Sequence, residues 1–237
     1  MIAKKFEEGY RDSKIVDDYD RKRFTSRHGK LYDELQREWV VKLLDPQEND
    51  IVLDAGAGTG RFSLELFAHC FYTYALDSSR PMLDKLKEKQ PYIKTFEGSV
   101  LSMPFDSHSF NKLNCMLVLR HFSDEDIKKV LKEFYRVLKK GRVLTFDMPN
   151  QRFVGLTERF KKRSEHNYTI DRGMYVSQVD ALVKECGFKV EEKKFLYKCP
   201  ISILSWLLKI YDFSNLMKWY ENKFNFGMQV IYKCRRM

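Results

Sequence analysis

The sequence predicts an α/β fold in which short apolar strands alternate with amphipathic helices. A glycine-rich turn, Asp54 to Gly60, follows the apolar run Ile51–Leu53 and precedes a helical pattern. A second apolar run ends in Asp77, and further apolar runs alternate with helical patterns as far as residue 147. This alternation is typical of a parallel sheet that is covered by helices.

The expected elements follow one another along the chain. Apolar residues at helical spacing predict a first helix over residues 30–44, which Asp45 and Pro46 end. Ser79 and Ser123 are typical N-caps of later helices, and Gly187 is a typical stop signal. We expect strands at 51–54, 72–76, 93–96, 112–116 and 142–147, extended segments near 188–198 and 227–235, and helices at 61–69, 80–89, 124–139 and 177–186.

The glycine turn and Asp77 together predict a βαβ unit that binds a nucleoside. Glycines at alternate positions let a ligand come close to the backbone, and the free N–H groups of the following helix face the same ligand. Asp77, at the tip of the second strand, is placed to accept hydrogen bonds from both hydroxyls of a ribose. The spacing G-x-G-x-G differs from the dinucleotide fingerprint, and no Lys-Ser/Thr pair follows to hold a phosphate.

The motifs between residues 50 and 150 resemble, in their order, those of a known enzyme family. After the glycine turn come the segments 75–83, 97–105, 109–111, 117–122 and 131–144. This series is similar to the type 11 domain of class I S-adenosylmethionine-dependent methyltransferases, which ubiquinone and menaquinone biosynthesis enzymes share. The resemblance implies a Rossmann-like sheet of seven strands, mostly parallel with the last strand antiparallel, and helices on both faces. It also implies S-adenosylmethionine as the cofactor.

The resemblance also implies a set of site residues. His121 follows the fourth strand and is the candidate catalytic base, since histidine titrates near working pH; a structural histidine in the loop is the alternative. Tyr19 and Arg23 are candidates to fold over the cofactor carboxylate, or else belong to a solvated charged helix. No metal is expected. The expected cofactor-binding residues are Asp54, Gly56, Gly58, Gly60, Asp77, Ser78, Met82, Ser99, Val100, Cys115, Tyr19 and Arg23.

The sequence departs from the family pattern at a few positions. Ser99 stands where the family usually has an aspartate that binds the adenine amino group, so adenine recognition is expected to be weaker. Asn111 replaces the usual aspartate after Phe110, and Gly141-Arg142 replaces a Gly-Gly turn. None of these changes removes the expected cofactor site.

Length and composition fit one domain over residues 1–237. We expect residues 1–45 to form an N-terminal helical cover, 46–150 the cofactor-binding core, and 151–237 the substrate-side insertions and final strands. The five cysteines lack CxxC spacing, which favours reduced thiols in a cytoplasmic protein. The sequence has neither a recognisable signal peptide nor an apolar run long enough for a membrane span.

The methyl acceptor is the least determined part of the interpretation. Motifs of DNA amino-methylases, cytosine-C5 enzymes and arginine methyltransferases are missing, which favours a small-molecule acceptor. The apolar segment 201–213 must be buried against the core, a second subunit, an apolar or quinone-like acceptor, or a membrane surface. The net charge of +10, with a basic C-terminal part, keeps a tRNA base as an alternative acceptor. A protein that binds S-adenosylmethionine without catalysis is the alternative from another class.

Overall fold

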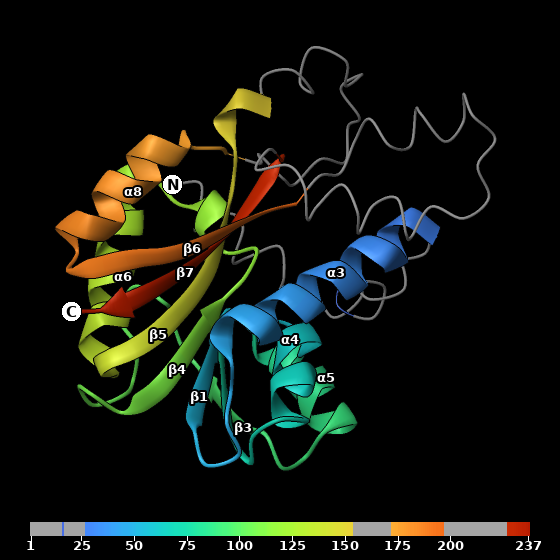
Figure 1. The fold of residues 1–237 in the computed structure, drawn as a ribbon. Helices are drawn as coiled ribbons and strands as arrows, with labels where there is room; N and C mark the ends of the chain where they lie inside the picture. The colour runs from blue at the N-terminus through green and yellow to red at the C-terminus, as the bar shows by residue number, and fades with distance from the viewer. Residues whose placement is uncertain (1–15, 17–26, 154–171, 197–226) are drawn as a thin grey trace.

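The computed structural model describes residues 16, 27–153, 172–196 and 227–237 (Figure 1). The predicted contacts of Tyr19 and Arg23 and the apolar segment 201–213 therefore lie outside the described residues. In the described part of the chain, no helix is long and apolar enough to cross a membrane.

The described elements follow the predicted alternation. The helices are α3 (Arg27–Leu44), α4 (Arg61–Phe67), α5 (Arg80–Lys89), α6 (Asp124–Val137) and α8 (Val176–Glu185), with a short 3-10 helix η1 (Leu119–His121). The strands are β1 (Ile51–Ala55), β2 (Tyr72–Asp77), β3 (Lys94–Glu97), β4 (Phe110–Cys115), β5 (Leu138–Pro149), β6 (Phe188–Leu196) and β7 (Gln229–Arg236). The predicted caps are confirmed, since the hydroxyl oxygens of Ser79 and Ser123 accept hydrogen bonds at the starts of α5 and α6.

The strands form one seven-stranded sheet in the order β3-β2-β1-β4-β5-β7-β6. Strands β1 to β5 pair in parallel, and β7 runs antiparallel to both of its neighbours. The order reverses between β1 and β4, because the chain leaves β1 toward β2 on one side and returns to β4 on the other. Ligands of open α/β sheets bind at such a switch point, outside the carboxyl ends of the strands.

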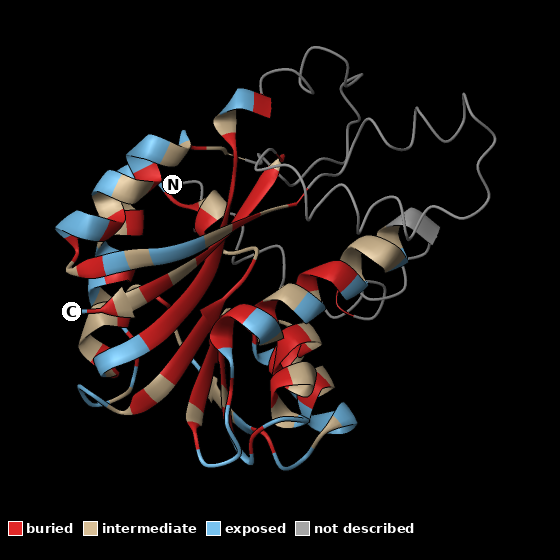
Figure 2. Ribbon diagram, in the orientation of Figure 1, coloured by how far each residue is buried: buried red, intermediate tan, exposed pale blue. Residues whose placement is uncertain are grey.

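Alternation along the strands divides the core between two faces. On β1, Val52 packs with Leu44 of α3 and Leu66 of α4, whereas Leu53 belongs to the large cluster that includes Phe134 of α6. Helices thus cover both faces, with α3, α4 and α5 on one side and α6 and α8 on the other (Figure 1). The central strands are buried over most of their length (Figure 2). The predicted seven-stranded sheet with helices on both faces is confirmed.

The boundary between the fourth helix and the fifth strand differs from the prediction. The helix expected to run to residue 139 ends at Val137, and β5 begins at once at Leu138 rather than at 142. The pairing of β4 with β5 shifts register between Phe110 and Lys112, where Gly141 takes a left-handed φ of 73°. A left-handed glycine within a strand pair is typical of a β-bulge. The glycine that suggested a turn therefore lies inside a strand.

Candidate cofactor and active site

The glycine turn lies at the carboxyl end of β1 and is tied to β2. The amide nitrogens of Gly56 and Ala57 donate to the carbonyl oxygen of Leu76 at 2.7 and 3.0 Å. Gly56 and Gly58 have φ angles of 78° and 54°, in the left-handed region that side chains disfavour. Gly60, also left-handed, is the N-cap residue of α4.

The glycines of the turn differ in what surrounds them. A Cβ atom at Gly56 would come 2.2 Å from Val118 Cγ2, and one at Gly60 would come 2.2 Å from Leu86 Cδ1. A Cβ atom at Gly58 would meet nothing within 4 Å. Packing against the protein thus requires glycine at 56 and 60, whereas Gly58 faces open space in which a ligand can approach the backbone.

Asp77 ends β2 directly beside this turn. Its Oδ2 accepts a hydrogen bond from the Gly58 amide at 2.8 Å, and its Oδ1 accepts one from the Ser79 amide at 2.9 Å. The side chain is half-buried, and the carbonyl oxygen of Asp77 accepts from the Gly98 amide at 2.9 Å. The carboxylate thus has a fixed orientation next to the space that Gly58 leaves open. A carboxylate has about four acceptor positions, so this orientation is compatible with binding ribose hydroxyls.

The other predicted contacts from β2 and β3 lie around Asp77. Ser78 is partly exposed, Met82 in the first turn of α5 is 3% exposed, and Val100 is 7% exposed and belongs to the large core cluster. Ser99 is partly exposed, and its hydroxyl oxygen accepts a hydrogen bond from the Leu101 amide at 3.3 Å. The partly exposed polar residues of this set are therefore Ser78 and Ser99, while Met82 and Val100 are buried apolar residues.

Asp54 is buried below the turn rather than exposed in it. Ser63 Oγ donates to its Oδ2 at 2.6 Å, and Asn114 Nδ2 donates to its Oδ1 at 2.8 Å. Thr145 Oγ1 in turn donates to Asn114 Oδ1 at 2.9 Å, which extends the network across β1, β4 and β5. Burial raises the pKa of Asp54 to about 6, although both side-chain hydrogen bonds oppose this rise. Any influence of this carboxylate on a ligand passes through the backbone that it supports.

Cys115, at the end of β4, is also enclosed. Its side chain is fully buried in the core cluster, and burial raises the pKa of the thiol well above its ordinary value. The thiol is therefore protonated and offers no reactive group to the site.

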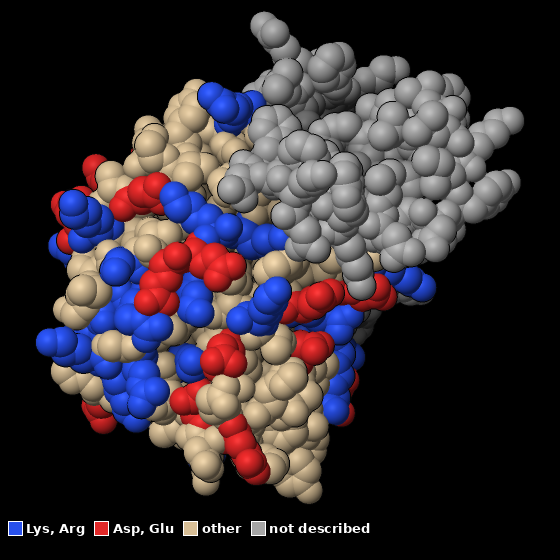
Figure 3. Space-filling view, in the orientation of Figure 1, with Lys and Arg blue, Asp and Glu red and all other residues tan. Residues whose placement is uncertain are grey.

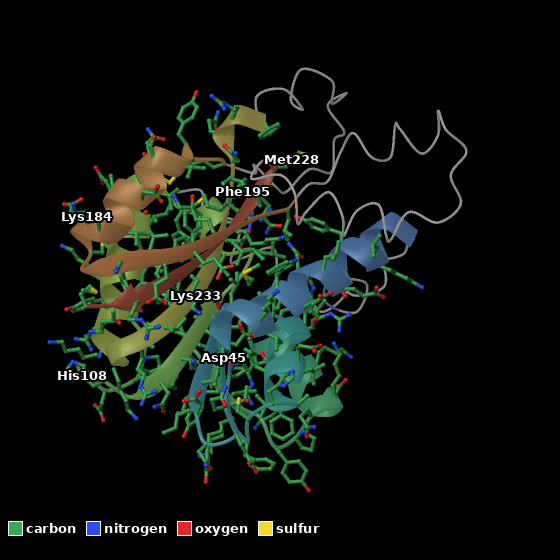
Figure 4. All side chains as sticks on the ribbon, in the orientation of Figure 1. Asp45, His108, Lys184, Phe195, Met228 and Lys233 are labelled. Carbon is green, nitrogen blue, oxygen red and sulfur yellow. The ribbon has the colours of Figure 1, made fainter. Side chains whose placement is uncertain are left out.

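His121 lies in η1, a helical turn that the sequence did not predict. Its amide donates to the carbonyl oxygen of Val118 at 3.1 Å, and its side chain is partly exposed. His69 follows α4 and His108 precedes β4, so both belong to the amino ends of strands. Figure 4 shows His108 at the opposite end of the sheet from Met228, which precedes β7. Among the histidines whose side chains are described, His121 is the one that follows the carboxyl end of a strand.

Sequence reasoning missed a third acid at this edge of the sheet. Asp147, near the end of β5, has a side chain with no exposure and accepts from Arg120 Nη2 at 2.6 Å. It also accepts from the Leu117 amide and from Gln229 Nε2. The signal was present, because Asp147 ends the apolar run Val143–Phe146 just as Asp54 and Asp77 end theirs. Within the described residues, no cluster of His, Cys, Asp and Glu could hold a metal ion.

The strand order, the antiparallel β7 and the site at the β1–β4 switch point define the fold of this protein. They are those of the class I methyltransferase fold, in which the glycine turn after β1 and the acid after β2 border the cofactor site. Residues 52–141 match the family model described as "Methyltransferase domain".

Individual relatives support the same assignment. The chain is 33% identical over 103 residues to an uncharacterized methyltransferase-like protein of Schizosaccharomyces pombe, covering 43% of this chain and 39% of that protein. It is 31% identical over 126 residues to a 2-phytyl-1,4-naphtoquinone methyltransferase of Trichormus variabilis, covering 48% and 54%. The chain thus spans about half the length, or less, of these curated relatives.

A solved structure extends the likeness over nearly the whole chain. A SAM-dependent methyltransferase of Thermotoga maritima, described as a "possible histamine N-methyltransferase", has a TM-score of 0.68 and 21% identity. The match covers 95% of this chain and 97% of that one. At this identity the likeness concerns the fold, and the acceptor needs separate arguments.

Proposed function

We propose that this protein binds S-adenosylmethionine at the carboxyl ends of β1, β2 and β4 and transfers its methyl group to a small-molecule acceptor. The observation that carries the proposal is the pairing of Asp77 with the glycine turn. An oriented carboxylate lies 2.8 Å from the Gly58 amide, where a Cβ atom would meet nothing within 4 Å. This combination fits a ribose beside the backbone better than it fits a phosphate, which a carboxylate would repel.

The residues assigned to the cofactor have different parts in this proposal. Asp77 binds the ribose hydroxyls, and Gly58 lets the cofactor approach the turn, whereas Gly56 and Gly60 let the turn pack against Val118 and Leu86. Ser99 accepts a hydrogen bond from the adenine amino group, while Met82 and Val100 border the ring. Asp54 and Cys115 act through the backbone that they support. Tyr19 and Arg23 are proposed to cover the cofactor carboxylate and lie outside the described residues.

The chemistry asks little of the protein beyond positioning. S-adenosylmethionine supplies a methyl group already activated by the positive charge of its sulfonium. The protein must hold the acceptor atom on the axis of displacement and exclude water. We assign to His121 the proton that an oxygen or nitrogen acceptor loses as the new bond to carbon forms. Its partly exposed side chain follows β4, at the edge of the sheet where Asp77 lies.

A small, apolar or quinone-like acceptor is the substrate class we favour. The similarity to a naphtoquinone methyltransferase supports it, as does the apolar composition of segment 201–213. Basic side chains do gather over β5, β6 and β7, but acidic side chains lie among them (Figure 3). Arg235, for example, is bonded to Glu191 by both its Nε and Nη2 atoms. This interleaving gives less support to a tRNA acceptor.

The proposal is tested by isotope-labelled methyl transfer from S-adenosylmethionine to a panel of reduced naphthoquinones, amines and tRNA. We expect methylated product from the reduced naphthoquinones. His121→Asn should lower the transfer rate by at least about 100-fold, the usual contribution of a general base, while cofactor affinity stays unchanged. Binding without transfer to any acceptor would instead favour a non-catalytic S-adenosylmethionine-binding protein. An unchanged rate in His121→Asn would remove this residue from the chemistry.

A further inference from the structure

Asp147 gathers hydrogen-bond donors from three separate segments onto one buried carboxylate. Its Oδ1 accepts from the backbone amide of Leu117, which follows β4. Its Oδ2 accepts from Arg120 Nη2 at 2.6 Å and from Gln229 Nε2 at the start of β7. The side chain of Asp147 has no exposed area, and that of Arg120 is 13% exposed. Because a buried carboxylate is costly without such partners, the arrangement is fixed by all of its donors.

Leu117 has a backbone conformation that leucine rarely takes. Its φ angle is 66°, in the left-handed region. The other non-glycine residues with positive φ in the described chain are Asp45 and His108, residue types that tolerate this region better. For a leucine the left-handed conformation is disfavoured by a factor of about five to thirty, so a surrounding contact must hold it. Two contacts are available: the Leu117 amide donates to Asp147, and the Leu117 side chain packs against the core cluster that includes Phe62.

The backbone conformation of Leu117 determines where Val118, the next residue, packs against the glycine turn. Val118 packs so closely on Gly56 that a Cβ atom there would lie 2.2 Å from Val118 Cγ2. Two residues later Arg120 returns to Asp147, and His121 follows it in η1. The Asp147 carboxylate therefore contacts both ends of the segment 117–120. This segment packs on the glycine turn through Val118 and leads directly to His121, the candidate base.

The same carboxylate is linked to the other end of the turn through Gln229. The Oε1 atom of Gln229 accepts from Gln36 Nε2 at 2.5 Å and also from the Tyr32 hydroxyl, both on α3. Gln36 Oε1 in turn accepts a hydrogen bond from Nη2 of Arg61, the residue that follows Gly60. Hydrogen bonds thus run from Asp147 toward Arg61 beside Gly60, while packing runs from Leu117 through Val118 to Gly56.

We propose that Asp147 is a positioning residue for the cofactor pocket. By holding Leu117 in the left-handed conformation, it keeps residues 116–121 against the glycine turn in the shape that binds the cofactor. The inference rests on the proposed S-adenosylmethionine site, but it concerns a residue that does not touch the cofactor.

The magnitude follows from the backbone preference of Leu117. Without Asp147, Leu117 relaxes to negative φ, and the binding-competent conformation becomes a minor population. The apparent dissociation constant rises by the inverse of that population, which is about five- to thirty-fold. Glycine takes the left-handed conformation without this penalty, so Leu117→Gly should restore binding in the absence of the carboxylate.

The experiment is a calorimetric titration with S-adenosylhomocysteine of wild type, Asp147→Ala, Leu117→Gly and the double variant. Asp180→Asn is the matched control, because Asp180 pairs with Lys193 beyond this network. We expect Asp147→Ala to bind at least about fivefold more weakly, and Leu117→Gly and Asp180→Asn to bind as wild type. The double variant should recover most of the loss.

The outcomes separate this inference from the function on which it rests. Failure of wild type to bind S-adenosylhomocysteine would contradict the proposed function itself. If wild type binds, equal affinity of folded Asp147→Ala, or no recovery in the double variant, would overturn the positioning role. If Asp147 had a purely structural role, Asp147→Ala and the double variant would both be less stable than wild type, and Leu117→Gly would not restore the affinity for S-adenosylhomocysteine. Should Asp147→Ala not fold, Asp147→Asn replaces it, since an amide cannot accept all three donors, and the same recovery by Leu117→Gly is required.

Discussion

Replacement of Gly58 by alanine separates the cost to folding from the cost to cofactor binding. The added Cβ atom meets no protein atom within 4 Å, so the folded state bears only the cost of placing an alanine at a φ of 54°. The left-handed conformation costs about 1–2 kcal/mol, and the stiffer unfolded chain offsets about 0.4–1 kcal/mol of this. We therefore expect a net loss of no more than about 1.6 kcal/mol in the free energy of unfolding.

Gly56→Ala is the matched control, because its Cβ atom would lie 2.2 Å from Val118 Cγ2. Overpacking adds about 1–3 kcal/mol to the same backbone cost, so this variant should be clearly less stable than Gly58→Ala. Urea unfolding measures both stabilities, and titration calorimetry measures the affinity for S-adenosylhomocysteine.

Gly58→Ala should be the more stable of the two variants but should lose more affinity for S-adenosylhomocysteine. The methyl group at position 58 occupies space that the cofactor needs, so Gly58→Ala should lose at least tenfold in affinity, about 1.4 kcal/mol. Affinity within twofold of wild type would refute the assignment of this space to the cofactor. Equal destabilisation of the two variants would refute the packing argument.

Further predictions concern pH, acceptor and charge. Because burial raises the pKa of Asp54 from 3.8 to about 6, the folded protein retains a proton that the unfolded chain has lost. Stability should then fall as pH rises from about 4 to 6, by up to about 1.4 kcal/mol per pH unit relative to Asp54→Asn, and parallel pH profiles of urea unfolding would contradict this. If segment 201–213 lines an acceptor channel, Trp206→Ala should weaken acceptor binding and leave cofactor affinity intact; unchanged acceptor KM would remove the sequence support for an apolar acceptor. Retention of tRNA should be weak and nonspecific, whereas tight, salt-sensitive binding that competes with methyl transfer would favour the tRNA alternative.

The sheet and the glycine turn could be predicted because their signals are local. Strand β2 alternates and ends in Asp77, and the helix that follows begins with the Ser79 cap, so a short window contains the whole pattern. The predicted bounds of most elements agree with the structure to within about two residues, except at the start of α3, which begins three residues early, and where Gly141 forms a bulge inside β5. Gly141 does interrupt the regular backbone, but whether it forms a turn or a bulge depends on how β5 pairs with β4.

The buried network could not be predicted, because its contacts join distant parts of the chain. Gln229 lies 82 positions from Asp147 and 193 from Gln36, and no spacing rule connects them. Sequence also could not tell that Asp54 would be enclosed by Ser63 and Asn114 while Asp77 remains half-exposed, since both acids end similar apolar runs. The groups that surround each acid, which come from distant positions such as Asn114, decide which of the two is exposed.

The most direct test of the account is calorimetric titration of wild type and Asp77→Ala with S-adenosylmethionine. The account predicts saturable binding to wild type. Asp77→Ala loses two charge-assisted hydrogen bonds to the ribose, worth about 1.5–3 kcal/mol each before water replaces part of them. We therefore expect at least about a tenfold loss of affinity with the fold intact, since the residue ends a strand. Absence of binding to wild type, or unchanged affinity in a folded Asp77→Ala, would contradict the cofactor site.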